Sequence, residues 1–465
     1  MGISKSPVEG QPSEDEARDR SVTPALGRIF YGWYIVGAGV LLSIMSGGMY
    51  VYGFSTFFLP LTREFGWSRA SLSGVVSIAR LEGGVLSPLV GYIIDRFGPR
   101  RLMLVGITMM GVGFILLSRV NSLVMFYVVF ILVVSGGSSF AIGTPVQTAV
   151  ANWFIKKRSR AIGFLMSGFG LGGAVTPLLV LLIASFGWRT TMVMCGLTLI
   201  ATGLPLAMVV RHRPEDSGLL PDGEDPSTRY DGATAEREAI ESRKLVAHGH
   251  GGFMGRFKED TRDVNLEPKE ALKTQAFWFI ALSFGLSMLT SGLITVHYIP
   301  FLVTDIGLSD AMAASVLAFH AVISVVARLA LGWIGDIINK RYLYSLCMWA
   351  QVVALLLLSN AHSLAMVMPA VVLMALAYGG PIPLRPAIQG DYFGRKNFAT
   401  ISGWLRIVDL PAIVAGPVFA GWVYDVTGSY SLGFLVVAFT TAISGLAILL
   451  ARRPEPKLAE APQVA

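Results

Sequence analysis

GYIIDRFGPRR, residues Gly91–Arg101, has a counterpart 241 residues further along the chain in GWIGDIINKR, residues Gly332–Arg341. In both copies an aspartate, Asp95 or Asp336, follows the glycine by four residues and precedes two adjacent basic residues. A glycine, an aspartate and a basic pair that recur at one offset indicate an internal repeat.

The repeat extends well beyond this stretch. At an offset of 240 residues, Gly163 matches Gly403 and Pro177 matches Pro417. Parallel repeats of two six-helix halves are the plan of transporters that rock around a central site. The sequence therefore predicts two related halves with a site between them.

Long apolar runs lie between these landmarks. Of the 465 residues, 53% are hydrophobic and 14% are charged, and the mean hydropathy is +0.61, whereas soluble proteins carry about a quarter charged residues. We therefore expect an all-α membrane protein that is embedded in the lipid bilayer. The net charge of +7 resides largely in short loops and does not indicate binding to nucleic acid.

Twelve transmembrane helices are predicted. Their expected limits are residues 31–60, 70–94, 101–119, 122–150, 160–186, 189–210, 275–303, 310–337, 342–360, 364–391, 398–425 and 430–451. A polar stretch separates two groups of six. The expected parts of the chain are a tail at 1–28, a first half at 29–211, a central loop at 212–273, a second half at 274–452 and a tail at 453–465.

Basic residues predict the orientation of the chain. The loops after the second, fourth, eighth and tenth spans contain DRFGPRR, KKRSR, NKR and GRK, whereas the opposite loops hold only scattered arginines. Because Lys and Arg of short loops stay on the cytoplasmic side, we expect both termini and the central loop to be cytoplasmic.

GYIIDRFGPRR resembles the signature between the second and third helices of the major facilitator superfamily. Asp95, Arg96 and Arg101 fill signature positions, and the second copy keeps Asp336 but lacks the arginine after it. The resemblance implies two six-helix halves that alternate access to a central site. An aspartate at a helix end can accept hydrogen bonds from the N-terminus of a neighbouring helix, so we expect these residues to hold one side of the protein closed. Alternatively, the basic residues serve topology alone.

Within the superfamily the chain resembles the monocarboxylate porters and the bacterial oxalate/formate exchangers. The resemblance is carried by YGWYIV, FFLPLTREFGWSRASLS, NWFIKKRSRAIG, HYIPFLVTDIGLS, ARLALGWIGD and DYFGRKNFATISG. It covers residues 31–451 apart from the central loop, and it implies a small carboxylate as the substrate.

Arg328 is the first candidate for binding that carboxylate. It lies eight residues before Asp336, so about 12 Å from the end of its helix and near the midplane, where transporters place their site. A guanidinium can hold a carboxylate with two parallel hydrogen bonds, and the resemblance implies this role for an arginine of the eighth helix. A fixed ion pair with a neighbouring helix is the alternative.

Two positions depart from the animal porters. Ser324 stands where those porters have an aspartate implicated in proton coupling, and Tyr52 stands near the position of their lysine in the first helix. The exchangers instead have a second cation in the eleventh helix, a role that Arg406 can fill. We expect Tyr52, Arg406 and His297 in the substrate site, with His297 or Glu82 as candidates for proton coupling.

Arg80 and Glu82 place two charges in the second span, where each costs about 2.5–3.5 kcal/mol on insertion scales. They are two residues apart and point to nearly opposite sides of a helix, so each needs another partner. Because the second and eleventh helices pack together in the superfamily fold, we expect Glu82 to pair with Arg406, or Arg80 with Asp409, as a gate. The alternative is a local pair of Arg406 with Asp409.

Three prolines mark the tenth span, YGGPIPLRPAIQG, residues Tyr378–Gly390. They cannot all fit an unbroken helix. We expect a broken helix with Arg385 beside the central cavity, and the alternative is a kink that carries Arg385 to the cytoplasmic surface.

The sequence thus predicts a secondary transporter of a small organic anion, first of all a monocarboxylate, coupled to protons or to anion exchange. The alternatives are a proton-coupled exporter of drug-like molecules and a transporter-like membrane sensor. The sequence contains no zinc-protease, nucleophile-elbow or phosphate-loop motif and no cluster of metal ligands. We therefore expect no enzyme activity, no cofactor and no metal, and a monomer in the bacterial inner (plasma) membrane.

Overall fold

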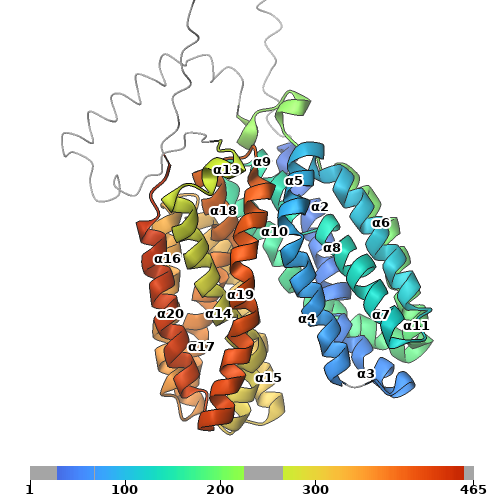
Figure 1. The fold of residues 1–465 in the computed structure, drawn as a ribbon, viewed down its shortest axis with the longest axis vertical. Helices are drawn as coiled ribbons and strands as arrows, with labels where there is room; N and C mark the ends of the chain where they lie inside the picture. Colours follow the sequence, from blue (N-terminus) through green and yellow to red (C-terminus); the bar gives the residue numbers. More distant parts are fainter. Residues whose placement is uncertain (1–28, 68, 225–264, 455–465) are drawn as a thin grey trace, which may run out of the picture.

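The computed structural model describes residues 29–67, 69–224 and 265–454 (Figure 1). All regular elements in these ranges are helical. The predicted tail at 1–28, almost all of the tail at 453–465 and most of the predicted central loop lie outside the described residues.

The first half contains the helices between Tyr31 and Val209. They are α2 (Tyr31–Ser46), η1 (Gly47–Val51), α3 (Phe54–Phe65), α4 (Arg69–Val85), α5 (Ser87–Phe97), α6 (Pro99–Leu117), α7 (Leu123–Val128), η2 (Val129–Ser135), α8 (Gly136–Ala141), α9 (Thr144–Trp153), α10 (Arg158–Gly172), η3 (Gly173–Val175) and α11 (Thr176–Val209).

Three short helices follow, and then the second half. The short helices are η4 (Glu215–Ser217), η5 (Pro221–Gly223) and α13 (Pro268–Ala271). The second half contains α14 (Gln275–Thr304), α15 (Asp310–Ile334), α16 (Lys340–Ser359), α17 (Leu364–Gly379), α18 (Pro381–Phe393), α19 (Phe398–Thr427) and α20 (Ser431–Leu450).

Ten helices in the described ranges are long and apolar enough to cross a membrane. The pair Gly74–Val85 and Ser87–Phe97, bent by 49°, makes eleven. One of the ten, Arg158–Val209, is 52 residues long and is interrupted at Gly187, where φ is 78°. A division of this long segment at Gly187 is consistent with the twelve crossings predicted from the sequence.

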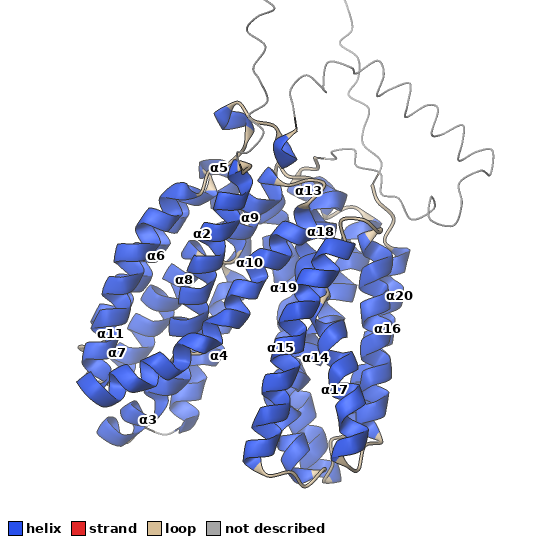
Figure 2. Cartoon of the chain, turned by 180° about the vertical axis from the view of Figure 1, so that it is seen from behind, coloured by secondary structure: helices blue, strands red, loops and turns tan. Residues whose placement is uncertain are grey.

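Each half has its own apolar core. The buried clusters around Ile35 and Phe57 belong to the first half, and those around Phe277 and Leu293 belong to the second. The halves meet at the end where α5, α9 and α18 lie and splay apart toward the other end (Figures 1 and 2). We call the first the clasp end and the second the open end.

Two helix crossings between the halves depend on glycine. Where α10 crosses α15, a Cβ atom on Gly163 would lie 2.9 Å from the Arg328 carbonyl, and one on Gly332 would lie 2.9 Å from the Ser159 carbonyl. Where α5 crosses α19, a Cβ atom on Gly91 or Gly403 would collide with the opposing backbone. The glycines that match in the sequence repeat are therefore positions where the two halves touch through their backbones.

The proline-rich tenth span forms two helices that meet at Gly380. The backbone angles of Gly380 remain helical, with φ −62° and ψ −49°, so the prolines remove hydrogen bonds without unwinding a turn. The Ala377 carbonyl, whose helical donor would be Pro381, instead accepts a hydrogen bond from Gln351 Nε2 at 3.0 Å. The predicted break is thus a boundary between two helices that continue as one 30-residue span.

Candidate functional site

A cavity of about 390 Å³ lies between the halves. The first half contributes Thr144, Gln147 and Met166, and the remaining lining residues come from α14, α16, α17, α18 and α19. Its charged lining residues are Arg385, Arg406 and Asp409.

A second cavity, of about 410 Å³, lies mainly in the first half. It shares Thr144, Gln147 and Arg406 with the first cavity, so Arg406 stands where the two meet. Its other charged lining residue is Arg80, on α4. Two cations from opposite halves therefore face one cavity.

Arg385 and Asp409 form a buried ion pair between α18 and α19. The Arg385 guanidinium also lies 4.5 Å from the centre of the Phe284 ring, a geometry that favours a cation–π contact. Asp409 Oδ1 has no hydrogen-bond partner among the described residues. The pair fixes Arg385 in the cavity wall, beside the cavity as one of the two sequence interpretations expected.

The predicted gate pairs of the second span are not formed in this structure. Glu82 Oε2 accepts a hydrogen bond from Ser135 Oγ at 3.0 Å, within the first half. Asp409 is paired with Arg385, so it does not meet Arg80 and does not form the predicted local pair with Arg406. The cause is the rotation of α4 about its own axis, which turns Glu82 toward Ser135 of its own half and Arg80 toward the second cavity.

Arg328 lies at the crossing of α15 and α10, behind the two cavities. Its Nη1 donates a hydrogen bond to the Met166 carbonyl at 3.2 Å, and Met166 itself lines the first cavity. Tyr52 and Tyr378 are close enough to interact electrostatically with Arg328. The residue predicted from the sequence as the primary anion ligand is thus one layer from the cavity, on a contact between the halves.

His297 does not line either cavity. Its Nδ1 is 3.1 Å from the Tyr430 hydroxyl and its Nε2 is 2.8 Å from the Pro417 carbonyl. Both ring nitrogens are therefore engaged within the second half, and the structure gives His297 a packing position rather than the predicted place at the substrate.

Asp95 caps the helix that begins the eleventh span. Its carboxylate accepts hydrogen bonds from the backbone N–H groups of Ala399 at 3.1 Å and Thr400 at 2.7 Å, and from the Thr400 hydroxyl at 2.6 Å. Arg96 donates to the Tyr92 hydroxyl at 2.8 Å, and Arg101 is exposed. Of the signature residues, the aspartate is thus the one that bridges the halves.

Asp336 makes the reciprocal contact. Its carboxylate accepts from the backbone N–H groups of Ser159 at 2.9 Å and Arg160 at 3.2 Å, at the N-terminus of α10. Burial raises the pKa of Asp336 to about 6, although Lys340 and these hydrogen bonds act against it. Each half therefore supplies a carboxylate that caps a helix of the other half.

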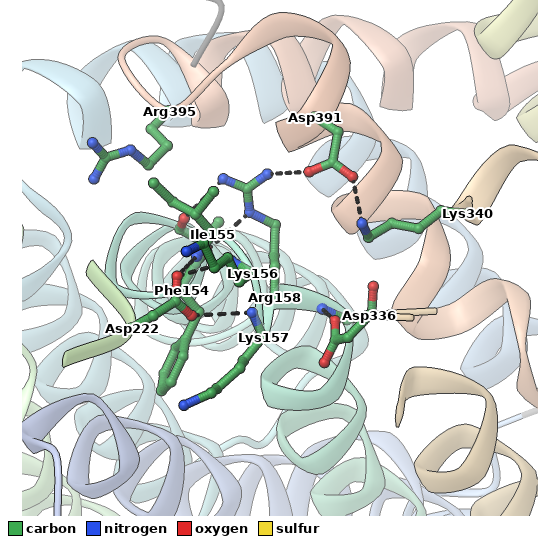
Figure 3. Close-up of polar contacts among 12 residues, drawn as sticks. Phe154, Ile155, Lys156, Lys157, Arg158, Asp222, Asp336, Lys340, Asp391 and Arg395 are labelled. Atoms are coloured by element: carbon green, nitrogen blue, oxygen red, sulfur yellow. Dashed lines mark hydrogen bonds and ion pairs between the residues drawn. The ribbon is translucent and has the colours of Figure 1, made fainter. Parts of the chain in front are cut away.

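A buried ionic triad lies beside Asp336 (Figure 3). Arg158 Nη1 is 2.6 Å from Asp391 Oδ1, and Lys340 Nζ is 2.8 Å from Asp391 Oδ2. Arg158 also donates from Nε to the Phe154 carbonyl at 3.1 Å, and its side chain is 1% exposed. The sequence interpretation missed this triad because it assigned KKRSR to topology.

Asp222 and Asn265, near the two ends of the segment that joins the halves, also form hydrogen bonds with loops at the clasp end. Asp222 accepts from the backbone N–H groups of Ile155, Lys156 and Lys157 at 2.8–3.0 Å. Asn265 accepts from those of Arg395 and Lys396 at 3.0 and 3.1 Å. These two loops correspond to each other in the repeat, so the segment holds both halves in related ways.

This arrangement can hold an anion in a pocket that is closed at one end. The described residues contain no group of three or more His, Cys, Asp or Glu that could bind a metal. The cations and neutral polar side chains that line the two cavities can recognise a ligand through ionic contacts and hydrogen bonds.

The family profile of the Major Facilitator Superfamily matches residues 36–328 and 280–465. The chain belongs to this superfamily of membrane transporters.

Its relatives include transporters named for monocarboxylates. Monocarboxylate transporter 13 of Bos taurus is 25% identical over 90% of this chain and 89% of its own length, and monocarboxylate transporter 12 of Xenopus laevis is 24% identical over 94% and 92%. An uncharacterized MFS-type transporter of Bacillus subtilis (strain 168), YcxA, is 23% identical over 85% and 89%. These relatives are transporters, not enzymes.

Solved structures share the fold. The E. coli fucose:proton symporter FucP has a TM-score of 0.63 at 12% identity, covering 91% of this chain and 98% of its own. The human organic anion transporter MFSD10 has a TM-score of 0.60 at 17% identity, covering 90% and 99%. The fold predicted from the repeat is confirmed.

Proposed function

We propose that this protein is a secondary transporter that moves a small organic anion, a monocarboxylate, across the plasma membrane by alternating access. The observation that carries this proposal is the charge of the two adjoining cavities. Arg385 and Arg406 line the first, Arg80 and Arg406 line the second, and the one carboxylate that lines either, Asp409, is paired with Arg385. The two remaining cations, Arg80 and Arg406, are exposed to these cavities, and positive charges inside a membrane-spanning bundle favour a bound anion.

Arg406 is the proposed primary ligand of the substrate carboxylate. It lies where the two cavities meet, and its guanidinium forms no ion pair with the described residues. A planar guanidinium can grip both oxygens of a carboxylate. Gln147 and Thr144, which line both cavities, supply neutral hydrogen-bonding groups from the opposite half.

The clasp end is proposed to be cytoplasmic. The basic loops with Arg100, Lys156, Lys340 and Lys396 lie there, in accordance with the distribution of Lys and Arg in membrane proteins. The cavity then opens to the outside in this structure. Rocking of the halves would break the two aspartate caps and expose the same cavity to the cytoplasm.

The test combines binding with flux. Thermal stabilisation of purified protein by mono- and dicarboxylates, neutral analogues and cationic dyes gives the ligand class, and uptake of labelled carboxylates into sealed proteoliposomes gives transport. Arg406→Ala should weaken carboxylate binding about 10–100-fold, because a charged hydrogen bond contributes about 1.5–3 kcal/mol. Arg119→Ala, an exposed arginine outside both cavities, is the matched control and should bind normally.

Two results would count against the proposal. Stabilisation by dyes alone would favour an exporter of drug-like molecules. Specific carboxylate binding without flux in sealed vesicles would favour a membrane sensor.

A further inference from the structure

Four buried polar atoms in one region of the second half have no hydrogen-bond partner among the residues that the structure describes. They are Tyr298 Oη on α14 and His320 Nδ1, Ser324 Oγ and Arg328 Nε on α15. Tyr298, His320 and Ser324 are at most 4% exposed. Native proteins leave few buried polar atoms unsatisfied, and an orphaned atom in a polar site is commonly satisfied by internal water.

The three residues of α15 share one face of the helix. His320, Ser324 and Arg328 are spaced four residues apart, so each lies one turn from the next. The ring of Tyr298 packs edge-on against His320, with 5.6 Å between the ring centres. Together these residues form a polar file that begins at His320 and ends at Arg328.

Tyr378 connects this file to the central cavity. Its ring centre is 5.8 Å from that of His320, and the same residue lines the first cavity. Tyr378 also interacts electrostatically with Arg328. His320 is therefore buried, yet it is one side chain from the cavity in which the substrate is proposed to bind.

One ring nitrogen of His320 is positioned to accept a proton. One ring nitrogen is hydrogen bonded to the backbone of Val371, on α17, while Nδ1 has no partner among the described residues. A neutral imidazole with one N–H engaged has a lone pair on its other nitrogen that can accept a proton.

Arg328 is the charged residue that acts on His320. The titratable groups facing His320 are Tyr298 of α14, Tyr378 of α17 and Arg328 of its own helix. The neighbouring helices α10 and α18 carry charged residues that are paired elsewhere: Arg158 with Asp391, Arg160 with Asp336, and Arg385 with Asp409. The guanidinium of Arg328 opposes a second positive charge on His320 until an anion neutralises it.

We propose that His320 carries the proton that is transported together with the anion, an inference that rests on the proposed function. A carboxylate bound at Arg406 brings a negative charge into the cavity one layer from Arg328 and so weakens the opposition of Arg328 to a charge on His320, and the Nδ1 lone pair then accepts one proton from water of the open end. After the halves rock, the carboxylate leaves, and Nδ1 returns the proton to water on the other side. No other bond is made or broken, and one anion and one proton move together.

The experiment separates coupling from movement of substrate. His320→Gln is reconstituted in proteoliposomes and tested for carboxylate accumulation driven by a pH gradient and for counterflow of labelled substrate at equal pH. Accumulation should fall at least 10-fold, while counterflow, which needs no net proton movement, should persist. His297→Gln is the matched control, because both ring nitrogens of His297 are engaged by protein groups, and it should keep both activities.

Carboxylate accumulation by the wild-type protein distinguishes a failure of the proposed function from a failure of the role proposed for His320. If the wild-type protein moves no carboxylate, the proposed function fails. If the wild-type protein responds to the pH gradient and His320→Gln responds equally, the role of His320 is overturned. Loss of counterflow together with accumulation in a well-folded His320→Gln would also overturn it, and His320→Asn, which differs in size, repeats the test if the Gln variant does not purify in a folded form.

Discussion

The two clasps that join the halves share one backbone design and differ in what supports it. Asp95 caps α19 and Asp336 caps α10, each through backbone N–H groups of the opposite half. Beside Asp336 lies the ionic triad centred on Asp391. In the repeat, the positions of Arg158 and Asp391 correspond to Phe398 and Ala151, which are apolar and fully buried.

The Asp95 clasp is accordingly filled by an apolar cluster. Val90, Ile94, Leu102 and Ala399 form a small core that spans the two halves. The repeat therefore preserves the capping carboxylate but not its surroundings. An apolar contact separates without leaving charge behind, whereas a buried triad specifies its partners at a cost in desolvation. The two clasps should therefore respond differently to substitution.

Arg158→Ala should cause the largest loss in the free energy of unfolding. The substitution leaves Asp391 and Lys340 buried with incomplete pairing, a change that costs about 3–5 kcal/mol in buried ion pairs. Phe398→Leu at the corresponding position of the apolar clasp should cost less than about 1.5 kcal/mol, because it nearly conserves volume. Thermal unfolding in detergent measures both. Equal losses in the two variants would show that the clasps do not differ as described.

The stability of the protein should depend on pH through Asp336. The pKa of Asp336, which lies beyond the end of the α15 span, is raised from 3.8 to about 6, mainly by burial. The folded protein therefore binds this proton more tightly than the unfolded chain does, and stability should increase as the pH falls through 6 and decrease as it rises. The difference corresponds to about 3 kcal/mol.

Asp336→Asn supplies the control for that pH dependence. The amide oxygen can still accept the backbone N–H groups of α10 but does not titrate in this range. The unfolding temperature of the wild type relative to Asp336→Asn should rise between pH 7.5 and pH 5. A constant difference across this range would contradict the assignment.

The smallest effect is expected at the two ends of the segment between the halves. Asp222→Ala should cost about 1–2 kcal/mol and Asn265→Ala about 0.5–1 kcal/mol, as for the loss of helix-capping acceptors, with the charged acceptor contributing more. High salt should reduce the effect of Asp222→Ala and leave that of Asn265→Ala unchanged. The same salt response in both variants would show that charge does not distinguish these contacts.

The fold could be predicted from the sequence because its signals are local or periodic. Long apolar runs gave the spans, and glycines at a fixed offset gave the relation between the halves. Asp95 and Asp336 could be recognised because an aspartate at a helix end can accept hydrogen bonds from the N-terminus of a neighbouring helix. These features do not depend on how the helices are rotated about their axes.

The pairing of charges could not be obtained in the same way. Arg158 and Asp391 are 233 residues apart, and the rotation of α4 determines that Glu82 contacts Ser135 instead of Arg406. One signal was present: Arg158 and Asp391 are charged where the other half of the repeat is apolar. Nor does the sequence distinguish His297 from His320, since the difference lies in whether each ring nitrogen meets a partner.

The glycine crossings near the clasp end have a consequence for capturing the transporter at different stages of its cycle. Gly163 and Gly332 mark one crossing, and Gly91 and Gly403 mark the other. A single methyl group at either crossing would push apart backbones that touch near the clasp end in this structure. Under the proposed cycle of alternating access, an alanine at any of these positions would disfavour the arrangement in which the clasp end is closed, and it is therefore a minimal tool for isolating the form in which that end is open.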